Sequence, residues 1–425
     1  MDPKKIIKKY IMPGVFMRVG AVVFSLLLAV TLVMGITALN AEVPDPVDFY
    51  PSETPTGVPA YIDVVGVSDW LYQYDEAVYY SVEDAYGYLY TVRLNDRQFE
   101  AVTTVNGPVL ILAGAGSGKT TVLVNRILNL VKFGNGYNSD YIPNYSDDDF
   151  KAGLDYLNGV TDFVPNGIFG DREVKPWQIL AITFTNKAAG ELKERIAAKL
   201  GDDALDIWAG TFHSVCGKIL RRNADFLGYT SNFTVYDTDD QRRLIKLIMK
   251  ENNIDEKFLP YKYALSAISN AKDSLITPEE FAATNANDFR LRQLAQVYKL
   301  YQDNLKKANA MDFDDMIVNT VRLLRDNDDI REYYANKFRY VCVDEYQDTN
   351  YAQYVLVGLL ASGRNNLCVV GDDDQSIYRF RGATIENILS FEHRYAESSI
   401  IRLEQNYRST QTILDVANEV ISNNR

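Results

Sequence analysis

The sequence feature that most constrains the fold is a glycine-rich loop, "AGAGSGKT", at residues 113–120. It follows "PVLIL", a short apolar run of strand type, and it precedes "TTVLVNRILNLVKF", whose apolar residues repeat with helical spacing. Glycines let backbone amides point at a phosphate group, beside a helix N-terminus that favours anions. The strict pattern begins with Gly, whereas the small residue Ala113 stands first here. The strand–loop–helix order therefore predicts a phosphate-binding loop.

The loop supplies residues for both ATP and Mg²⁺. Lys119 is expected to reach the β and γ phosphates, and the Thr120 hydroxyl is expected to ligate Mg²⁺. The ATP-binding residues predicted in this loop are Ala113, Gly114, Ala115, Gly116, Ser117, Gly118, Lys119, Thr120 and Thr121.

A second strand-like run, in "RYVCVDEYQDTN", ends in two adjacent carboxylates. Asp344 suits the Mg²⁺ shell, and Glu345 is placed to orient and deprotonate an attacking water. Further apolar runs end in polar clusters in "ILAITFTNKAAG", "LCVVGDDDQSIYRFRGA" and "IIRLEQNYRST". Strands of this kind, separated by helical stretches, predict a parallel α/β sheet whose carboxyl edge carries the site.

The net charge of −13 does not exclude a nucleic-acid partner, because the charge is unevenly distributed. Residues 41–92 contain acidic but no basic side chains, and 131–176 is also net negative. The remainder after residue 92 is near neutral, which leaves room for a local basic groove. The three cysteines form no CxxC pair and only two histidines are present, so we expect neither zinc nor disulfides.

The N-terminal region predicts a membrane segment. Residues 19–39 are uncharged and mostly apolar, and a helix of about 20 residues spans a ~30 Å hydrocarbon core. The basic residues of 1–18 are expected to stay in the cytoplasm, with a cleaved signal and a retained anchor as open alternatives. Residues 40–92 are acidic and rich in Pro and Tyr, with partial alternation that predicts one or two strands.

From about Leu94 to the C-terminus, the motifs together resemble superfamily 1 DNA helicases of the UvrD/PcrA/Rep type. "LNDRQFEAV" resembles the adenine-reading segment, with Gln98 as the reader, and "AGAGSGKT" and "VDEYQDTN" resemble the two Walker motifs. The resemblance implies that Gln375 senses the γ-phosphate, that Tyr407 stacks on adenine and that Arg408 contacts the γ-phosphate. The predicted catalytic residues are therefore Lys119, Glu345, Gln375 and Arg408.

The resemblance extends to DNA-facing segments, "TFTNKAA", "GTFHS" and the end of "GDDDQSIYRFRGA". Aromatic rings beside cations suit single strands, because every base offers a face for stacking. Where Phe380 stands, the family commonly has Trp. The implied DNA-binding residues are Phe184, Thr185, Asn186, Thr211, His213, Tyr378, Phe380 and Arg381.

The same resemblance divides the chain into domains. Residues 93–225 and 309–405 are expected to form a RecA-like ATP-binding domain of the P-loop NTPase class, with 134–176 as a surface insertion. Residues 226–308 are expected to form an inserted helical subdomain, and 406–425 the truncated start of a second RecA-like domain. Because the family binds ATP between two such domains, we expect slow hydrolysis and no unwinding from this chain alone.

The leading functional prediction is an ATP-dependent 3′→5′ DNA helicase or translocase that acts on single-stranded or tailed duplex DNA. One alternative is the motor part of a RecB/AddA-like helicase–nuclease. Another is a membrane-anchored nucleotide- or DNA-binding protein without turnover, and a third is a non-functional fusion product. The N-terminus predicts a membrane location and the helicase body a cytoplasmic one, so we interpret the two parts as unrelated segments that have been joined.

Overall fold

The computed structural model describes residues 72–74, 77–83, 89–138, 148, 174–372, 375 and 386–422, with side chains from Leu94 onward except at 418, 421 and 422. All of these residues belong to one compact unit. The predicted membrane segment at 19–39 lies outside them, as does most of the predicted insertion at 134–176. None of the helices in the described ranges is long and apolar enough to cross a bilayer.

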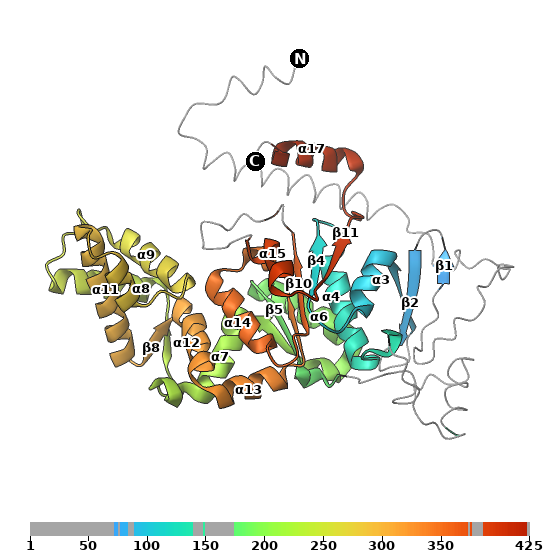
Figure 1. The fold of residues 1–425 in the computed structure, drawn as a ribbon, viewed down its shortest axis with the longest axis horizontal. Coiled ribbons are helices and arrows are strands. Elements are labelled where there is room, and N and C mark those ends of the chain that lie inside the picture. Colours follow the sequence, from blue (N-terminus) through green and yellow to red (C-terminus); the bar gives the residue numbers. More distant parts are fainter. Residues whose placement is uncertain are drawn as a thin grey trace, which may run out of the picture. The chain divides into compact units, whose positions relative to one another are not determined.

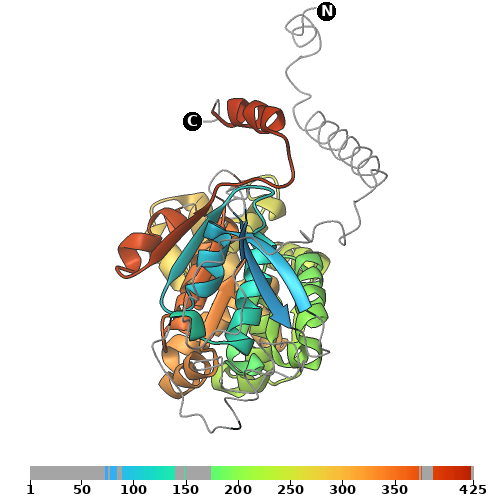
Figure 2. The same ribbon diagram turned by 90° about the vertical axis from the view of Figure 1, so that its right-hand side faces the viewer.

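A six-stranded parallel sheet forms the centre of the unit (Figures 1 and 2). Its strand order is β11–β4–β10–β9–β5–β6. The bounds are β4 Val109–Ala113, β5 Ile179–Thr183, β6 Trp208–Thr211, β9 Tyr340–Val343, β10 Leu367–Gly371 and β11 Ser399–Leu403. The central strands are almost entirely buried and are apolar except for Thr183 at the end of β5, as expected for strands that are covered on both faces. The sheet confirms the predicted parallel α/β class.

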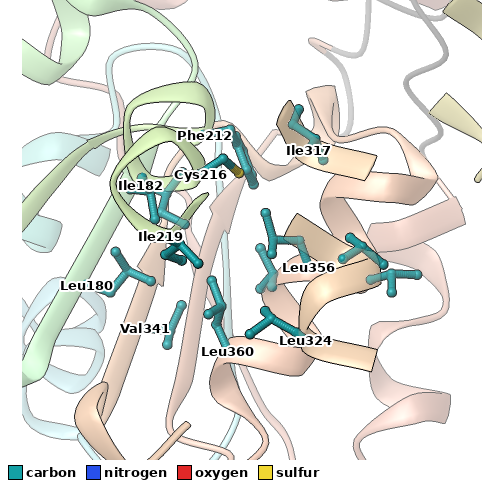
Figure 3. Close-up of a cluster of buried hydrophobic side chains, with 14 of the residues drawn as sticks. Leu180, Ile182, Phe212, Cys216, Ile219, Ile317, Leu324, Val341, Leu356 and Leu360 are labelled. Carbon is teal, nitrogen blue, oxygen red and sulfur yellow. The ribbon is translucent and has the colours of Figure 1, made fainter. Parts of the chain in front are cut away.

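Helices cover both faces of this sheet and enclose two cores. On one face lie α3 (Asp96–Thr103), α4 (Lys119–Lys132) and α6 (Asn186–Leu200). On the other lie α7 (Phe212–Asn223), α12 (Phe313–Asp326), α13 (Asp328–Lys337) and α14 (Tyr351–Ala361). In Figure 3, strand residues such as Leu180 and Val341 face helix residues such as Leu356. The cysteines are free and buried, Cys216 in one core and Cys342 and Cys368 in the other.

A helical insertion leaves the sheet at β7 (Thr234–Tyr236) and returns at β8 (Ala310–Asp312), and these two short strands pair in parallel. Between them lie α8 (Thr238–Glu251), α9 (Tyr261–Asp273), α10 (Pro278–Thr284) and α11 (Phe289–Lys307). Side-chain caps begin three of these helices, at Asp237, Thr277 and Asp288. The insertion has a hydrophobic core of its own and lies beside the sheet in Figure 1.

A buried group of charges lies where the insertion meets the sheet domain. Lys272 Nζ is 2.6 Å from Asp312 Oδ2 and 2.8 Å from Asp315 Oδ1, and all three side chains are almost fully buried. The hydroxyl of Tyr301 donates to Asp312 over 2.9 Å. Burial alone would lower the pKa of Lys272, but the two carboxylates hold it above its ordinary value. Both sides of the junction thus contribute to one ion cluster.

Three antiparallel strands precede the parallel sheet: β1 (Tyr72–Tyr74), β2 (Ala77–Glu83) and β3 (Leu89–Asn95). The sequence predicted one or two strands here, and the structure has three. The boundary expected after residue 92 also falls inside β3, which pairs with β2 from Leu89 to Asn95. That boundary rested on the change in charge near Arg93, whereas strand pairing is set by backbone hydrogen bonds along the whole strand.

The remaining elements are short or lie at the ends of the sheet domain. Single turns of 3₁₀ helix are η2 (Gly136–Asn138), η3 (Pro176–Gln178), η5 (Ala224–Leu227) and η6 (Tyr346–Asp348), and η4 (Gly201–Asp206) is longer. The short helices α15 (Glu386–Leu389) and α16 (Phe391–Arg394) precede β11. Helix α17 (Gln411–Ser422) follows it, and Ile413, Val416 and Val420 are exposed there.

Candidate functional site

The phosphate loop joins the end of β4 to the start of α4, as the sequence predicted. Gly116 and Gly118 have φ angles of 80° and 87°, a left-handed conformation that favours glycine. A Cβ atom at Gly116 would lie 2.6 Å from Arg408 Cβ, and one at Gly118 would lie 2.7 Å from Gln98 Nε2. The loop backbone therefore packs closely against two other predicted site residues, and glycine permits that approach.

The acidic pair follows β9 and faces the loop. Glu345 has a φ of 50°, which turns the chain sharply out of the strand into η6. Lys119 Nζ is 3.3 Å from Glu345 Oε2 and 3.9 Å from Asp372 Oδ2 at the end of β10. Since β9 and β10 are neighbours and β10 pairs with β4, the three carboxyl ends meet at one edge. The structure thus brings together residues that are more than two hundred positions apart in the sequence.

Gln347, for which the sequence predicted no role, connects Glu345 to the residue that follows β10. Its Nε2 donates to Glu345 Oε2 over 2.8 Å, and its Oε1 accepts the backbone N–H of Asp372 over 3.0 Å. Gln347 is 2% exposed. Gln375 in turn donates to the Asp372 carboxylate. The predicted γ-phosphate sensor is therefore linked to the predicted base through hydrogen bonds.

The carboxylates of this corner are crowded. Burial, and next the charge of Glu345, raise the pKa of Asp344 to about 6. The same two causes raise the pKa of Asp348 to about 6. Lys119 pairs with Glu345 rather than with Asp344, so Asp344 gains little charge compensation from it. A hard cation beside Asp344 would supply that compensation, and carboxylate and hydroxyl oxygens are the donors that Mg²⁺ prefers. The oxygen donors of Asp344 and Thr120 are of the type that Mg²⁺ takes, and their magnesium role stays a prediction.

The described residues include no group of three or more His, Cys, Asp or Glu side chains arranged to hold a metal. This does not conflict with the assignment, because Mg²⁺ beside a nucleotide usually takes only one or two protein carboxylates, together with phosphate oxygens and water.

Tyr407 and Arg408 lie beside the phosphate loop from the segment that follows β11. The Tyr407 amide donates to Gly116 O over 2.9 Å, and Asn406 bonds to Ala115 O. The Tyr407 hydroxyl accepts from Asn95 Nδ2 over 2.9 Å, and its side chain is half-exposed. The ring therefore stands beside the loop with its hydroxyl anchored.

Gln98 lies against the same loop but is buried. Its Nε2 donates to Ser117 O over 2.8 Å, and its Oε1 accepts the Asn95 amide in a capping box at the start of α3. The side chain is 3% exposed. Its contacts here are with the loop backbone, and its predicted role as adenine reader stays a prediction.

The buried Arg126 fixes α3 to α4. Its guanidinium donates to the carbonyls of Ala101 and Thr104 over the end of α3, and to that of Val105. Ala101 lies in the last turn of α3, where carbonyls lack partners within the helix, and Thr104 and Val105 follow directly after it. The helix that carries Gln98 is thereby held against the helix that carries Lys119.

A cavity of about 440 Å³ opens between these elements. It is lined by Ala115, Gly116, Gly118, Lys119, Thr120, Thr121, Arg195, Glu345, Gln375, Tyr407 and Arg408. All four predicted catalytic residues are in this lining. Arg195 was not predicted, because it lies in the middle of α6, outside any motif.

The predicted DNA-binding residues that are described gather at the carboxyl ends of β5 and β6, two paired strands. Phe184 is partly buried, with its ring centroid 5.4 Å from that of Phe212. Thr185 and Thr211 each accept an amide hydrogen bond as the cap of the following helix, α6 and α7 respectively. The exposed Asn186 begins α6. Tyr378, Phe380 and Arg381 lie outside the described residues.

His213, the remaining residue of this set, lies in the first turn of α7. Its ring centroid is 5.6 Å from that of Phe313, which is 46% exposed. Burial lowers the pKa of His213, so the neutral ring is favoured.

A phosphate loop beside an acidic pair, at the carboxyl edge of a parallel sheet, defines a P-loop nucleotide-binding protein. Residues 94–142 and 168–396 match the family described as "UvrD/REP helicase N-terminal domain", and the chain belongs to this family.

Similar proteins include "ATP-dependent DNA helicase PcrA" of Staphylococcus aureus and of Staphylococcus epidermidis. Each is 49% identical over 331 residues, which cover 78% of this chain and 40% of the relative. The chain thus spans less than half the length of these relatives.

Proposed function

We propose that this chain is the ATP-binding part of an ATP-dependent 3′→5′ DNA helicase or translocase. The observation that carries the proposal is the single cavity lined by Lys119, Glu345, Gln375 and Arg408, four side chains from separate segments of the chain. The relatives named as ATP-dependent DNA helicases support it. The direction of movement and the preference for single-stranded or tailed duplex DNA come from the family resemblance.

The residues in the cavity and directly behind it suggest how each would act. Lys119 carries three donors and would meet the β and γ phosphates. Thr120 and Asp344 would hold Mg²⁺, which supplies neutralising charge when bound. Glu345 accepts from both Lys119 and Gln347 at Oε2, and its Oε1 has no hydrogen-bond partner among the described residues. That second oxygen is available to orient and deprotonate a water.

Arg408 would add positive charge at the γ-phosphate as the transition state forms. An arginine in this role accelerates related phosphoryl transfers by about 10³- to 10⁵-fold. Its backbone is held by Asn406, whose Oδ1 accepts the Arg408 amide over 2.8 Å.

The first test is the replacement of Lys119 by alanine. We expect the affinity for Mg²⁺-ATP, measured by titration calorimetry on the full chain, to fall about tenfold or more, since hydrogen bonds to charged groups are worth about 1.5–3 kcal/mol. Lys132→Ala is the matched control, because it removes a lysine from the last turn of the same helix, away from the cavity. Equal affinity in wild type and Lys119→Ala would refute the loop assignment.

The second test concerns DNA. Binding of an oligothymidylate, followed by fluorescence anisotropy, should weaken with salt, because phosphate contacts release counterions. Phe184→Ala combined with Phe380→Ala should loosen DNA binding and leave the ATP affinity unchanged, since base stacking is worth about 1–3 kcal/mol per base. Unchanged DNA binding in the double variant would place the stacking surface elsewhere.

A further inference from the structure

A second recess lies where the strands of the sheet begin, at the opposite end from the nucleotide cavity. Trp177, Tyr333, Asn336 and Lys337 line an open hollow of about 540 Å³. Trp177 belongs to η3 just before β5, and the other three belong to α13, which precedes β9. These are the amino ends of the strands, whereas the nucleotide cavity lies at their carboxyl ends. In Figure 1, α13 lies at the lower end of the sheet, away from the tip of β4.

Lys337 lines the recess, and two further cations, Lys218 and Arg222, lie close to it. Lys337 Nζ and Lys218 Nζ are 4.0 Å and 5.0 Å from the ring centroid of Trp208. Arg222 lies over the ring of Tyr333, with its Cζ atom 5.0 Å from the centroid, and donates to the Tyr333 hydroxyl over 3.0 Å. In the described part of the chain, none of these three cations forms a salt bridge with a carboxylate.

The ends of the helices at the recess account for only part of the clustering of cations there. Lys337 and Arg222 lie in the last turns of α13 and α7, where a helix end favours a cation by about 0.3–1 kcal/mol. Each helix C-terminus carries roughly −0.5 elementary charge, so the two helix ends do not neutralise three full charges. The pKa of Lys337 is lowered by burial and then by the charges of Arg222 and Lys218, which indicates that the local field is positive.

The aromatic side chains at the recess are of the types that are common in protein-binding surfaces. Trp177 is 47% exposed and Tyr333 is 45% exposed. Tryptophan, tyrosine and arginine are the residues most enriched where protein interfaces gain their binding energy. Trp177 has no aromatic or cationic partner among the described residues, so its ring is available to an apolar side chain of a partner.

The ring contacts favour a peptide over a nucleic acid. Trp208 has two lysines over its ring and Tyr333 has Arg222 over one face, which leaves fewer ring faces on which successive bases could stack. A compact site with fixed cations and one open indole suits one or two carboxylates beside a single apolar side chain.

We propose that this recess binds an acidic peptide segment of a partner protein, with carboxylates at Lys337, Lys218 and Arg222 and an aromatic side chain against Trp177. The net charge of −13 does not prevent this, because fields beyond about 10 Å are screened at 0.1 M salt. The cations at the recess therefore determine the local attraction.

The test uses the full chain and a short fluorescein-labelled peptide with one phenylalanine between two runs of glutamate. Anisotropy at about 0.1 M salt should show saturable binding. Trp177→Ala and Lys337→Glu should each weaken binding roughly tenfold. Trp177→Phe should restore most of the loss, because it returns an aromatic ring. Lys299→Glu is the charge-matched control at an exposed position of α11 and should bind like wild type. Circular dichroism and ATP affinity should be unchanged in all four variants.

Three results would overturn the proposal. The first is no binding of the acidic peptide to the wild-type chain at millimolar concentration. The second is equal binding of a peptide whose glutamates are replaced by glutamine, which would remove the role of charge. The third is an oligothymidylate that displaces the peptide and loses affinity through the same substitutions, which would make the recess a nucleic-acid site. None of these results depends on the proposed helicase function.

Discussion

Two glycines of the phosphate loop, Gly114 and Gly116, differ in their surroundings. Gly116 has a positive φ, and a Cβ there would meet Arg408 Cβ and the Asn406 side chain. Gly114 has an ordinary φ, and a Cβ there would meet nothing within 4 Å. Glycine at 116 therefore allows the loop to approach the segment that carries Tyr407 and Arg408.

We predict that Gly116→Ala lowers the free energy of unfolding by about 1–3 kcal/mol, through backbone strain and the close contact with Arg408. Gly114→Ala should change it by about 0.5 kcal/mol or less. Urea unfolding without nucleotide measures both. Equal stability of the two variants would show that the Arg408 segment is not held against the loop.

At the scale of elements, the buried ion cluster at the junction of the helical insertion supports a second prediction. Lys272→Met removes the only cation that contacts Asp312 and Asp315 in the described structure, and leaves two buried carboxylates. Breaking a buried pair in this way costs about 3–5 kcal/mol. Lys299→Met, at an exposed position on α11, should change stability by about 0.5 kcal/mol or less. A loss below about 1 kcal/mol in Lys272→Met would mean that the cluster does not hold the junction.

Asp273, next to this cluster, supports a prediction about pH. It accepts a hydrogen bond from Asn350, and burial followed by the charges of Asp314 and Asp312 raises its pKa to about 7. Because the pKa is higher in the folded state than in the unfolded state, this group's contribution to stability is complete below about pH 4 and is lost as the pH rises through 7.

Asp273→Asn removes the titrating carboxyl group, and with it this loss of stability as the pH rises. We therefore expect the free energy of unfolding of the variant, relative to that of wild type, to increase by roughly 1–3 kcal/mol from pH 5 to pH 8, as measured by urea unfolding. Asp303→Asn, which neutralises an exposed carboxylate on α11, serves as the control and should show no such trend. A difference between Asp273→Asn and wild type that stays constant with pH would contradict the assignment.

At the scale of the whole unit, the three cysteines report on global unfolding. Cys216 lies on one side of the sheet, Cys342 and Cys368 lie on the other, and all are buried. Burial raises the pKa of Cys216 to about 12, which leaves little reactive thiolate. A hydrogen bond with Cys342 lowers the pKa of Cys368 to about 7, so at that site burial alone keeps the reagent away. We expect maleimide to label the native chain slowly and the urea-unfolded chain at once. Ser231→Cys adds an exposed thiol and should label at once in the native state. Rapid native labelling of wild type would show that the cores open without unfolding.

The sequence alone determined the parts of the site that depend on local order. The run "VLILAGAGSGKTTVL" specified a strand, a turn that needs glycine and a helix, because each of these is encoded by neighbouring residues. The acidic pair after "RYVCV" could be placed at a strand end for the same reason. Alternation of apolar runs with helical stretches was enough to predict the parallel sheet.

Only the tertiary structure decided which side chains meet. Gln347 links Glu345 to the end of β10, Arg195 reaches the cavity from the middle of a helix, and Asn95 holds the Tyr407 hydroxyl. None of the three stands out in its own segment, because its role depends on a partner brought close by strand order. The recess at Trp177 likewise exists only because η3 and α13 converge at the amino ends of the strands. Local sequence encodes the elements, and long-range packing determines what they bring together.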